Sequence, residues 1–299
     1  MSKTQAWISA ARPRTLPLAL SCIGMGSFLA ASRNKFDGLI FLFCCLTTIS
    51  LQVLSNLAND YGDSVHGADH AGREGPMRAV QSGIISSSEM KRAVAVFVVA
   101  SLLCGITLLL LAFGWDLKAL LFFFSLGVLC ILAAVAYTVG RRPYGYIGLG
   151  DLSVLIFFGI VGVMGSLYLF TSTVAAIDVL PALSCGLFSM AVLNVNNIRD
   201  IDADRKAGKF SLPVRMGRAA AINYHWFLLI GGMTCSLIYV AVSFQSPWQL
   251  LFLVTAPFFF RNGVAVSSLP SAVLDPYLKQ LALSTLAFVL TFGIGLMAD

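Results

Sequence analysis

The feature of this sequence that most restricts its fold is the length of its uncharged segments. No Asp, Glu, Lys or Arg occurs between Arg218 and Arg261, and this stretch is too long for one membrane-spanning helix. A helix needs about 20 apolar residues to cross a hydrocarbon core of ~30 Å. Charged residues make up 11% of the chain, whereas a typical soluble domain has about 25%. The sequence therefore predicts a membrane protein with several spanning helices, and it excludes a soluble domain.

Uncharged runs divide the chain into nine expected membrane helices, which gives an all-α bundle formed by a single domain of residues 1–299. The long run after Arg218 is divided into two helices at the polar segment Gln245–Trp248. The expected spans are Leu16–Ser32, Leu39–Ala58, Ala93–Gly114, Ala119–Gly140, Leu152–Ile177, Val179–Ile198, Ala221–Val242, Trp248–Phe260 and Gln280–Ala298. The eighth is the shortest of them.

The distribution of basic residues predicts the orientation. Every Lys and Arg lies at the N-terminus or in a loop that follows an even-numbered helix, except Arg33, Lys35 and Lys118. Cytoplasmic loops carry an excess of Lys and Arg. We therefore expect the N-terminus in the cytoplasm and the C-terminus on the opposite side of the cell (inner) membrane. The net charge of +6 reflects this topology together with an anion bound by the cytoplasmic loops, so a nucleic-acid partner is not expected.

Two of the expected cytoplasmic loops, 59–92 and 196–218, hold most of the charged residues and are related to each other. In each, an Asn is followed by an Asp four residues on, a Pro 17 residues on and an Arg 19 residues on. These residues are Asn59, Asp63, Pro76 and Arg78 in the first loop, and Asn196, Asp200, Pro213 and Arg215 in the second. Identical offsets indicate an internal duplication, and both copies face the same side, where they can converge on one site.

The spacing within each copy predicts a site for a divalent cation. Residues at i, i+4 and i+8 drift by only about 40° per step around a helix, so Asn196, Asp200 and Asp204 share one face. Asn59 and Asp63 share another. Two such faces opposed form a cage of carboxylate and carboxamide oxygens, which are ligands that Mg²⁺ prefers, and substrate phosphate usually completes its shell. Asp202 points about 200° away from Asp200, so it is expected outside the cage, either in solvent or in contact with the ligands.

Charged loops can also serve only to fix the topology of a membrane protein. That alternative is weaker here, because several polar residues lie at or inside the end of a hydrophobic span, where they are costly and usually functional. They are Asn194, Asn196, Asn197 and Asp200.

With these motifs the sequence resembles the UbiA-type membrane prenyltransferase superfamily, and more narrowly its members that use 1,4-dihydroxy-2-naphthoate in menaquinone (vitamin K2) biosynthesis. The matching segments are Ala11–Pro17, Asn56–Asp63, Gln81–Gly83, Tyr137–Asp151, Asn196–Asp204, Ala207–Lys209 and Val214–Gly217. One position departs from the pattern of many relatives, which place a further Asp where Gly67 stands here. Asp69 is a candidate for its replacement.

The resemblance implies a bundle whose central cavity opens to lipid and is capped by the two Asp loops. It also implies transfer of a polyprenyl chain from polyprenyl diphosphate to 1,4-dihydroxy-2-naphthoate, with loss of CO₂ and diphosphate, to form demethylmenaquinol. The implied cofactor is Mg²⁺, and membrane lipid surrounds the protein. The sequence does not determine the polyprenyl chain length or the oligomeric state.

Roles for individual residues follow from the resemblance and the spacing together. The metal ligands are expected among Asn59, Asp60, Asp63, Asp69, Asn196, Asp200 and Asp204, of which Asp63, Asp200 and Asp204 are catalytic. The diphosphate is expected to bind Arg73, Arg78, Lys209 and Arg215. The acceptor pocket is expected to include Tyr137, Tyr144, Tyr146 and Asp151, although the three tyrosines also suit interfacial aromatic anchors.

Two alternatives remain open at this stage. The acceptor can be another aromatic acid, such as 4-hydroxybenzoate or homogentisate. A transporter for an organic anion would also show internal repeats, but its site should lie near the bilayer midplane, whereas the carboxylates here lie at helix ends.

Overall fold

The structure, a computed structural model, describes residues 2–66 and 78–298. In this part of the chain all regular elements are helical, and nine helical segments are long and apolar enough to cross a membrane. Their bounds are Lys3–Ala31, Gly38–Val65, Ser87–Phe113, Leu117–Ala136, Gly150–Thr171, Ala176–Arg199, Leu212–Val242, Pro247–Ser268 and Asp275–Met297. The prediction of an all-α protein with nine spans is confirmed, although several bounds differ.

The first span consists of two helices joined by a kink. Helix α1 (Lys3–Ala11) ends at Arg12, whose left-handed backbone (φ 49°) turns the chain. A short 3₁₀ turn, η1 (Pro13–Thr15), then leads into α2 (Leu16–Ala31). The side-chain amide of Asn56 donates to the carbonyl of Ala11 at 3.0 Å, so the kink is held against the neighbouring helix.

The fifth span changes its winding along its length, from α6 (Gly150–Val154) through η3 (Leu155–Gly165) to α7 (Ser166–Thr171). The middle part is a π-helix, a rare winding that often occurs at functional sites. It lies very close to the following span, because a Cβ at Gly159 would be 2.9 Å from the carbonyl oxygen of Ala182. The span ends before the expected Ile177, since Ser172 adopts a left-handed backbone (φ 56°).

The eighth span is longer than the sequence indicated. It consists of η5 (Pro247–Thr255) and α11 (Ala256–Ser268), so Arg261 lies inside it. The expected end at Phe260 is wrong because a long Arg side chain can follow the apolar surface and place its charge at the interface; Arg261 is indeed exposed. The fourth span, α5 (Leu117–Ala136), ends four residues before the expected Gly140.

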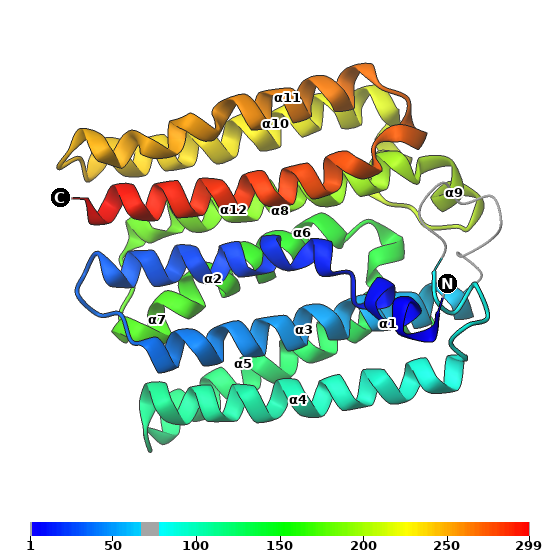
Figure 1. Cartoon of the computed structure of the whole chain (residues 1–299), viewed down its shortest axis with the longest axis horizontal. Helices are drawn as coiled ribbons and strands as arrows, with labels where there is room; N and C mark the ends of the chain where they lie inside the picture. Colours follow the sequence, from blue (N-terminus) through cyan, green and yellow to red (C-terminus); the bar gives the residue numbers. More distant parts are fainter. Residues whose placement is uncertain (1, 67–77, 299) are drawn as a thin grey trace.

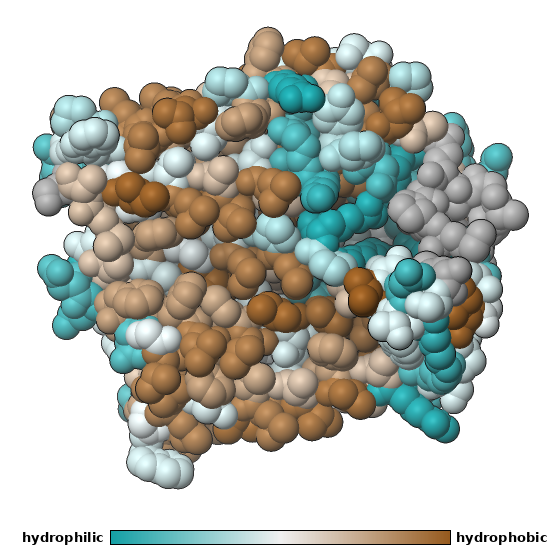
Figure 2. Space-filling model, viewed as in Figure 1, coloured by the Kyte–Doolittle hydropathy of each residue, from teal (hydrophilic) through white to brown (hydrophobic). Residues whose placement is uncertain are grey.

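The main buried core lies among α2, α8 (Val179–Arg199), α10 (Leu212–Val242), α11 and α12 (Asp275–Met297). At its centre the ring of Phe188 packs against Phe259 and Phe288, with ring centroids 4.3 and 5.0 Å apart. Helix α5 and α4 (Ser87–Phe113) instead expose many large apolar side chains. Much of the face shown in Figure 2 is apolar, as expected for a surface in contact with lipid.

Both Asp motifs lie at one end of the bundle. In Figure 1 the N-terminus, the last turns of α3 (Gly38–Val65) and the short helix α9 (Ile201–Lys206) lie at this end, and the C-terminus lies at the other. An odd number of spans requires this arrangement of the termini. Polar side chains also gather toward this end on the face shown in Figure 2. The expected ligands Asp69 and Arg73, together with Gly67, lie outside the described residues.

Candidate active site

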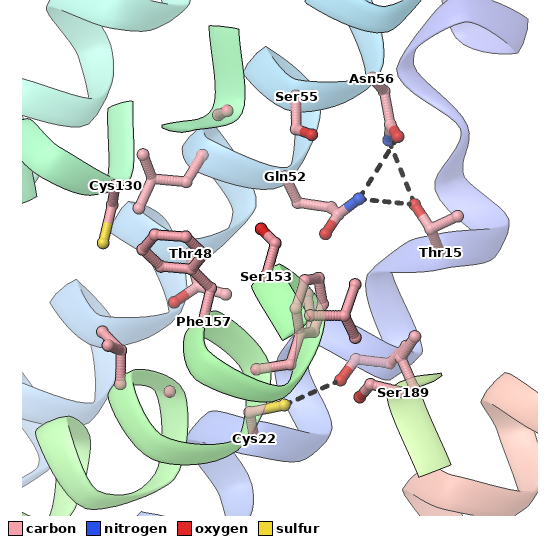
Figure 3. A pocket seen from close by; sticks show the side chains of 18 of the residues that line it. Thr15, Cys22, Thr48, Gln52, Ser55, Asn56, Cys130, Ser153, Phe157 and Ser189 are labelled. Atoms are coloured by element: carbon pink, nitrogen blue, oxygen red, sulfur yellow. Dashed lines mark hydrogen bonds between the residues drawn. The ribbon is translucent and has the colours of Figure 1, made fainter. Parts of the chain in front are cut away.

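A cavity of about 430 Å³ lies inside the bundle, next to the end that carries the Asp motifs. Its walls come from α2, α3, α4, α5, the π-helix and α8, and most of the wall is apolar. The polar side chains of both motifs meet it at one end: Asn59, Asp63, Arg78, Asn196, Asn197 and Lys209. A second polar group, which includes Gln52 and Asn56, lies earlier along the same helix as Asn59 and also lines the cavity (Figure 3).

The first motif is formed by the last turns of α3. Asp63 is 2% exposed and accepts hydrogen bonds from the Tyr146 hydroxyl (2.6 Å) and the Arg78 guanidinium (2.6 Å). The same nitrogen of Arg78 donates to the carbonyl of Asn59 at 2.9 Å. The Asn59 side-chain oxygen accepts from the hydroxyl of Thr138 at 3.1 Å. The structure therefore brings together Asn59, Asp63 and Arg78 with Tyr146, which was expected in the acceptor pocket.

Close packing of the chain makes this arrangement possible. A Cβ at Gly62 would lie 2.6 Å from the carbonyl oxygen of Thr138, so only glycine allows α3 to approach the segment after α5. Asp60 does not line the cavity; one of its oxygens accepts from the backbone N–H of Ala79 at 3.3 Å, and the other is buried without a hydrogen-bond partner. Its expected role as a ligand therefore stays a prediction.

In the second motif, Asp202 lies on a different side of the helix from Asp200 and Asp204, as its spacing predicts. Helix α8 ends at Arg199 and α9 begins at Ile201, but the helical hydrogen bonds continue through Asp200. Its N–H donates to the Asn196 carbonyl at 3.1 Å, and its own carbonyl accepts from Asp204 N–H at 2.8 Å. Asp200 and Asp204 are buried, whereas the Asp202 side chain is 75% exposed. Asp202 therefore lies in solvent, which is one of its two expected places.

The side chain of Asp200 pairs with its neighbour Arg199 through two hydrogen bonds, of 2.8 and 2.7 Å. Arg199 is almost completely buried and also donates to the side chains of Asn196 (2.9 Å) and Asp275 (2.5 Å). Asp275 in turn accepts from Arg14 at 2.7 Å. This network ties the end of α8 to the start of α12 and to η1.

Asp275 was missed by sequence reasoning. One signal was available, because it is the sole acidic residue between Asp204 and Asp299 and it lies five residues before the expected membrane helix Gln280–Ala298. Arg199 lies within the second motif, but the spacing argument gave it no role.

Asp204 is buried and, like Asp200 but unlike Asp63, does not itself line the cavity. One of its oxygens lies 3.4 Å from the ammonium group of Lys209, and the other is buried without a hydrogen-bond partner. Burial raises the pKa of Asp204 above its ordinary value; Lys209 opposes this effect, and the charges of Asp200 and Asp63 add to it. The buried carboxylates of Asp63, Asp200 and Asp204 repel one another, so a bound cation would stabilise them.

Oxygen donors of this type fit Mg²⁺. In the described residues, however, no three carboxylate, imidazole or thiol groups are gathered as a ready metal site. Arg78, Arg199 and Lys209 pair with the three aspartates in this arrangement.

The expected diphosphate-binding residues fall into two groups. Lys209 lines the cavity, and its ammonium group lies 5.9 Å from the centre of the Tyr146 ring. Arg215 is exposed and does not line the cavity. It donates to the carbonyls of Phe210 (3.0 Å) and Ile147 (2.9 Å), and so it joins two loops instead of facing the phosphate site.

The expected acceptor residues also separate. Tyr137 and Tyr144 line the cavity, with their rings edge to face and 5.3 Å apart. Burial raises the pKa of both phenols, so both stay protonated. Tyr146 and Asp151 do not line it: Tyr146 bonds to Asp63, and the buried Asp151 accepts from the Tyr224 hydroxyl at 3.0 Å. Their expected place in the acceptor pocket lacks support.

The sequence matches the family model described as UbiA prenyltransferase family over residues 19–269, and the chain belongs to this family. It is therefore an integral membrane protein of the prenyltransferase class. It is 45% identical over 297 residues, 99% of this chain and 96% of the relative, to a protein of Escherichia coli (strain K12) named 1,4-dihydroxy-2-naphthoate octaprenyltransferase. A protein of Haemophilus influenzae with the same name is 44% identical over 299 residues, 99% of this chain and 96% of the relative.

The fold is also that of a solved structure described as a UbiA homolog from Archaeoglobus fulgidus bound to DMAPP and Mg²⁺. The two chains superimpose with a TM-score of 0.65 at 15% identity, over 96% of this chain and 99% of the other. At this identity the likeness concerns the fold alone.

Proposed function

We propose that the protein transfers a polyprenyl chain from polyprenyl diphosphate to 1,4-dihydroxy-2-naphthoate, with release of diphosphate and CO₂, to form demethylmenaquinol. The observation that carries the proposal is the polarity of the cavity: Asp63, Arg78 and Lys209 meet it at one end, and most of its wall is apolar. A substrate with a diphosphate head and a long hydrocarbon tail is likewise charged at one end and apolar along the rest of its length. The names of the E. coli and H. influenzae relatives support the choice of acceptor.

The diphosphate is assigned to the end of the cavity where the two motifs meet. The proposed metal ligands are Asn59, Asp63, Asn196, Asp200 and Asp204, directly or through water, and Arg78 and Lys209 are proposed to hold the remaining phosphate oxygens. Bound Mg²⁺ supplies positive charge that stabilises the diphosphate as it leaves. Support comes from the unpartnered buried oxygen of Asp204 and from the A. fulgidus homolog, which is described as bound to Mg²⁺ together with DMAPP.

Arg215 is omitted from this assignment because its side chain bonds to two backbone carbonyls away from the cavity. Asp60 stays a prediction: one of its oxygens accepts from the N–H of Ala79, and the other is buried without a partner. Asp69 and Arg73 stay predictions, since they lie outside the described residues.

The apolar part of the cavity suits the rest of the reaction. Transfer of a polyprenyl tail into water would cost ~0.8 kcal/mol per CH₂, so the tail is best kept in hydrocarbon. Cleavage of the C–O bond leaves an allylic cation, which the faces of aromatic side chains such as Tyr137 favour by roughly 0.5–2 kcal/mol. The electron-rich naphthoate ring then attacks this cation. Exclusion of water protects the cation from hydrolysis.

We also propose that the Asp end faces the cytoplasm of the cell (inner) membrane, with the N-terminus on that side. Reaction of an impermeant thiol reagent from outside intact cells should occur at a Cys placed at Asn34 and not at a Cys placed at Ser87. Labelling at Ser87 alone would reverse the orientation.

The function is tested by mass spectrometry of the lipid product. Purified protein is incubated with octaprenyl diphosphate, Mg²⁺ and one of three acceptors: 1,4-dihydroxy-2-naphthoate, 4-hydroxybenzoate or homogentisate. We expect a prenylated and decarboxylated product from the naphthoate, loss of activity in EDTA and recovery on addition of Mg²⁺. Product from 4-hydroxybenzoate alone would refute the acceptor, and turnover in EDTA would refute the metal.

A further inference from the structure

A polar stripe on α3 continues deeper into the membrane than the diphosphate site requires. Gln52 lies seven residues before Asn59, which places it on the same face about 10 Å further along the helix. Thr48, Gln52, Ser55 and Asn56 all line the cavity. Polar side chains inside a membrane span are costly and usually serve a function, and the binding of Mg²⁺ and diphosphate does not account for these.

The amide of Gln52 has a fixed direction. Its nitrogen donates to the Thr15 hydroxyl oxygen (3.3 Å) and to the Asn56 side-chain oxygen (3.3 Å). The Thr15 hydroxyl uses its hydrogen on the Arg12 carbonyl (2.9 Å), so its oxygen can only accept from Gln52. The Asn56 nitrogen donates to the Ala11 carbonyl, so the Asn56 oxygen must face Gln52. Reversal of the Gln52 amide would break both of its bonds.

The oxygen of Gln52 is consequently presented to the cavity. Figure 3 shows the amide nitrogen toward Thr15 and the oxygen on the other side, where Ser153 and Thr48 lie. Among the described residues, none donates a hydrogen bond to this oxygen. A carbonyl oxygen in a mostly apolar cavity gains from a donor, so the site favours a ligand that carries one.

Ser153 supplies a second acceptor in the same cavity by similar reasoning. Its hydroxyl oxygen lies 3.0 Å from that of Tyr144. Because the Tyr144 hydroxyl donates to the Ala133 carbonyl at 2.9 Å, Ser153 must be the donor to Tyr144. The remaining lone pairs of Ser153, a residue that also lines the cavity, can then accept.

We propose that Gln52 and Ser153 bind two ring hydroxyl groups of the aromatic acceptor, with Gln52 Oε1 and Ser153 Oγ each accepting a hydrogen bond from a different hydroxyl. The inference rests on the proposed function and deepens it, because two fixed acceptors select a ring with two hydroxyl donors over a ring with one. A site built to bond a hydroxyl discriminates strongly against an analogue that lacks it.

The test compares three ligands on three kinds of protein. The ligands are 1,4-dihydroxy-2-naphthoate, measured by its KM, and the analogues 1-hydroxy-2-naphthoate and 4-hydroxy-2-naphthoate, measured as competitive inhibitors. The proteins are the wild-type chain, Q52M and S153A. Loss of one hydrogen bond to a hydroxyl should weaken binding of the dihydroxy acceptor by about tenfold in each variant.

The two variants should differ in which monohydroxy analogue they still bind normally. Q52M should leave one monohydroxy analogue bound as tightly as by the wild type, and S153A should do the same for the other, because each analogue already lacks the hydroxyl that the variant no longer binds. The KM for octaprenyl diphosphate should not change in either variant. Equal weakening of all three ligands, or no weakening, would overturn the proposal.

Matched controls exclude a general effect of lost polar groups. Q280M removes an amide that bonds to Asn262 and Ser284 away from the cavity, and S184A removes a hydroxyl buried against Ser236. Both should leave all three constants unchanged. If the wild type makes no product from the dihydroxynaphthoate, the proposed function fails; if it does and Q52M and S153A bind every ligand normally, only this inference fails.

Discussion

The two Asp motifs have the same spacing in the sequence but different counter-ions in the structure. In the first, Asp63 pairs with Arg78, 15 residues further along the chain. The residue at the matching offset in the second motif, Arg215, bonds to two backbone carbonyls, and Asp200 pairs with its neighbour Arg199. The two motifs therefore share the positions of their acids, but their matching arginines make different contacts. Spacing on a helix determines which way an acid faces, whereas its partner depends on the path of the chain afterwards.

The two copies also differ in what holds their counter-ions. Arg78 bonds to Asn59 and Asp63, both on α3. Arg199 bonds to Asn196 on its own helix and to Asp275 on α12, which also binds Arg14. The second motif is thus tied to two further parts of the bundle, whereas these two bonds of Arg78 both lead to α3.

The largest effects are expected from the acids, where the two motifs should behave alike. D63N and D200N each remove a ligand charge from the place where charge develops on the diphosphate, and loss of one such contact commonly lowers the rate by ~10²–10³. Initial rates at saturating Mg²⁺ measure this. A large loss in only one of the two would show that the copies do not serve one site equally.

The bases should separate the two copies. R78Q removes a cationic partner of Asp63 at the cavity, so kcat/KM for the prenyl diphosphate should fall about 10- to 100-fold, as expected for a hydrogen bond between charged groups. R215Q removes exposed bonds to carbonyls and should lower it by less than about fivefold. Equal losses in both variants would mean that Arg215 turns into the site when substrate binds, and that the two matching arginines have the same role.

An intermediate effect is expected from D275N, because Arg199 keeps Asp200 and Asn196 but loses its other carboxylate. We expect a lower unfolding temperature in detergent and a rate reduced about tenfold, as for the loss of one charge-assisted hydrogen bond. The control is D37N at the start of α3, where Asp37 caps the helix and Asn caps equally well. An unchanged D275N protein would show that Arg199 positions Asp200 without help from α12.

The sequence predicted those features of the structure that depend on neighbouring residues along the chain. Charge-free runs located the nine spans, and helical spacing predicted which of Asp200, Asp202 and Asp204 is exposed. It did not predict contacts between segments that are far apart in the chain. Asp275 lies far from the second motif along the chain, and its contact with Arg199 depends on how α12 packs. The separation of Tyr146 and Asp151 from the cavity likewise depends on the turn that follows α5, for which no periodic pattern exists.

The smallest effect is expected from D202N, which tests the rule common to both motifs. Asp202 lies between two buried acids but projects into solvent, where an Arg205 nitrogen lies 3.9 Å from its carboxylate. An exposed ion pair contributes little, so the rate should stay within about threefold of wild type, while D204N should fall with D200N. If all three acids only kept the loop soluble, all three variants would be equally mild. An inactive D202N beside an active D200N would show that the direction of a side chain on its helix does not decide which acid serves the reaction, and the proposed ligands would have to be chosen again from other residues.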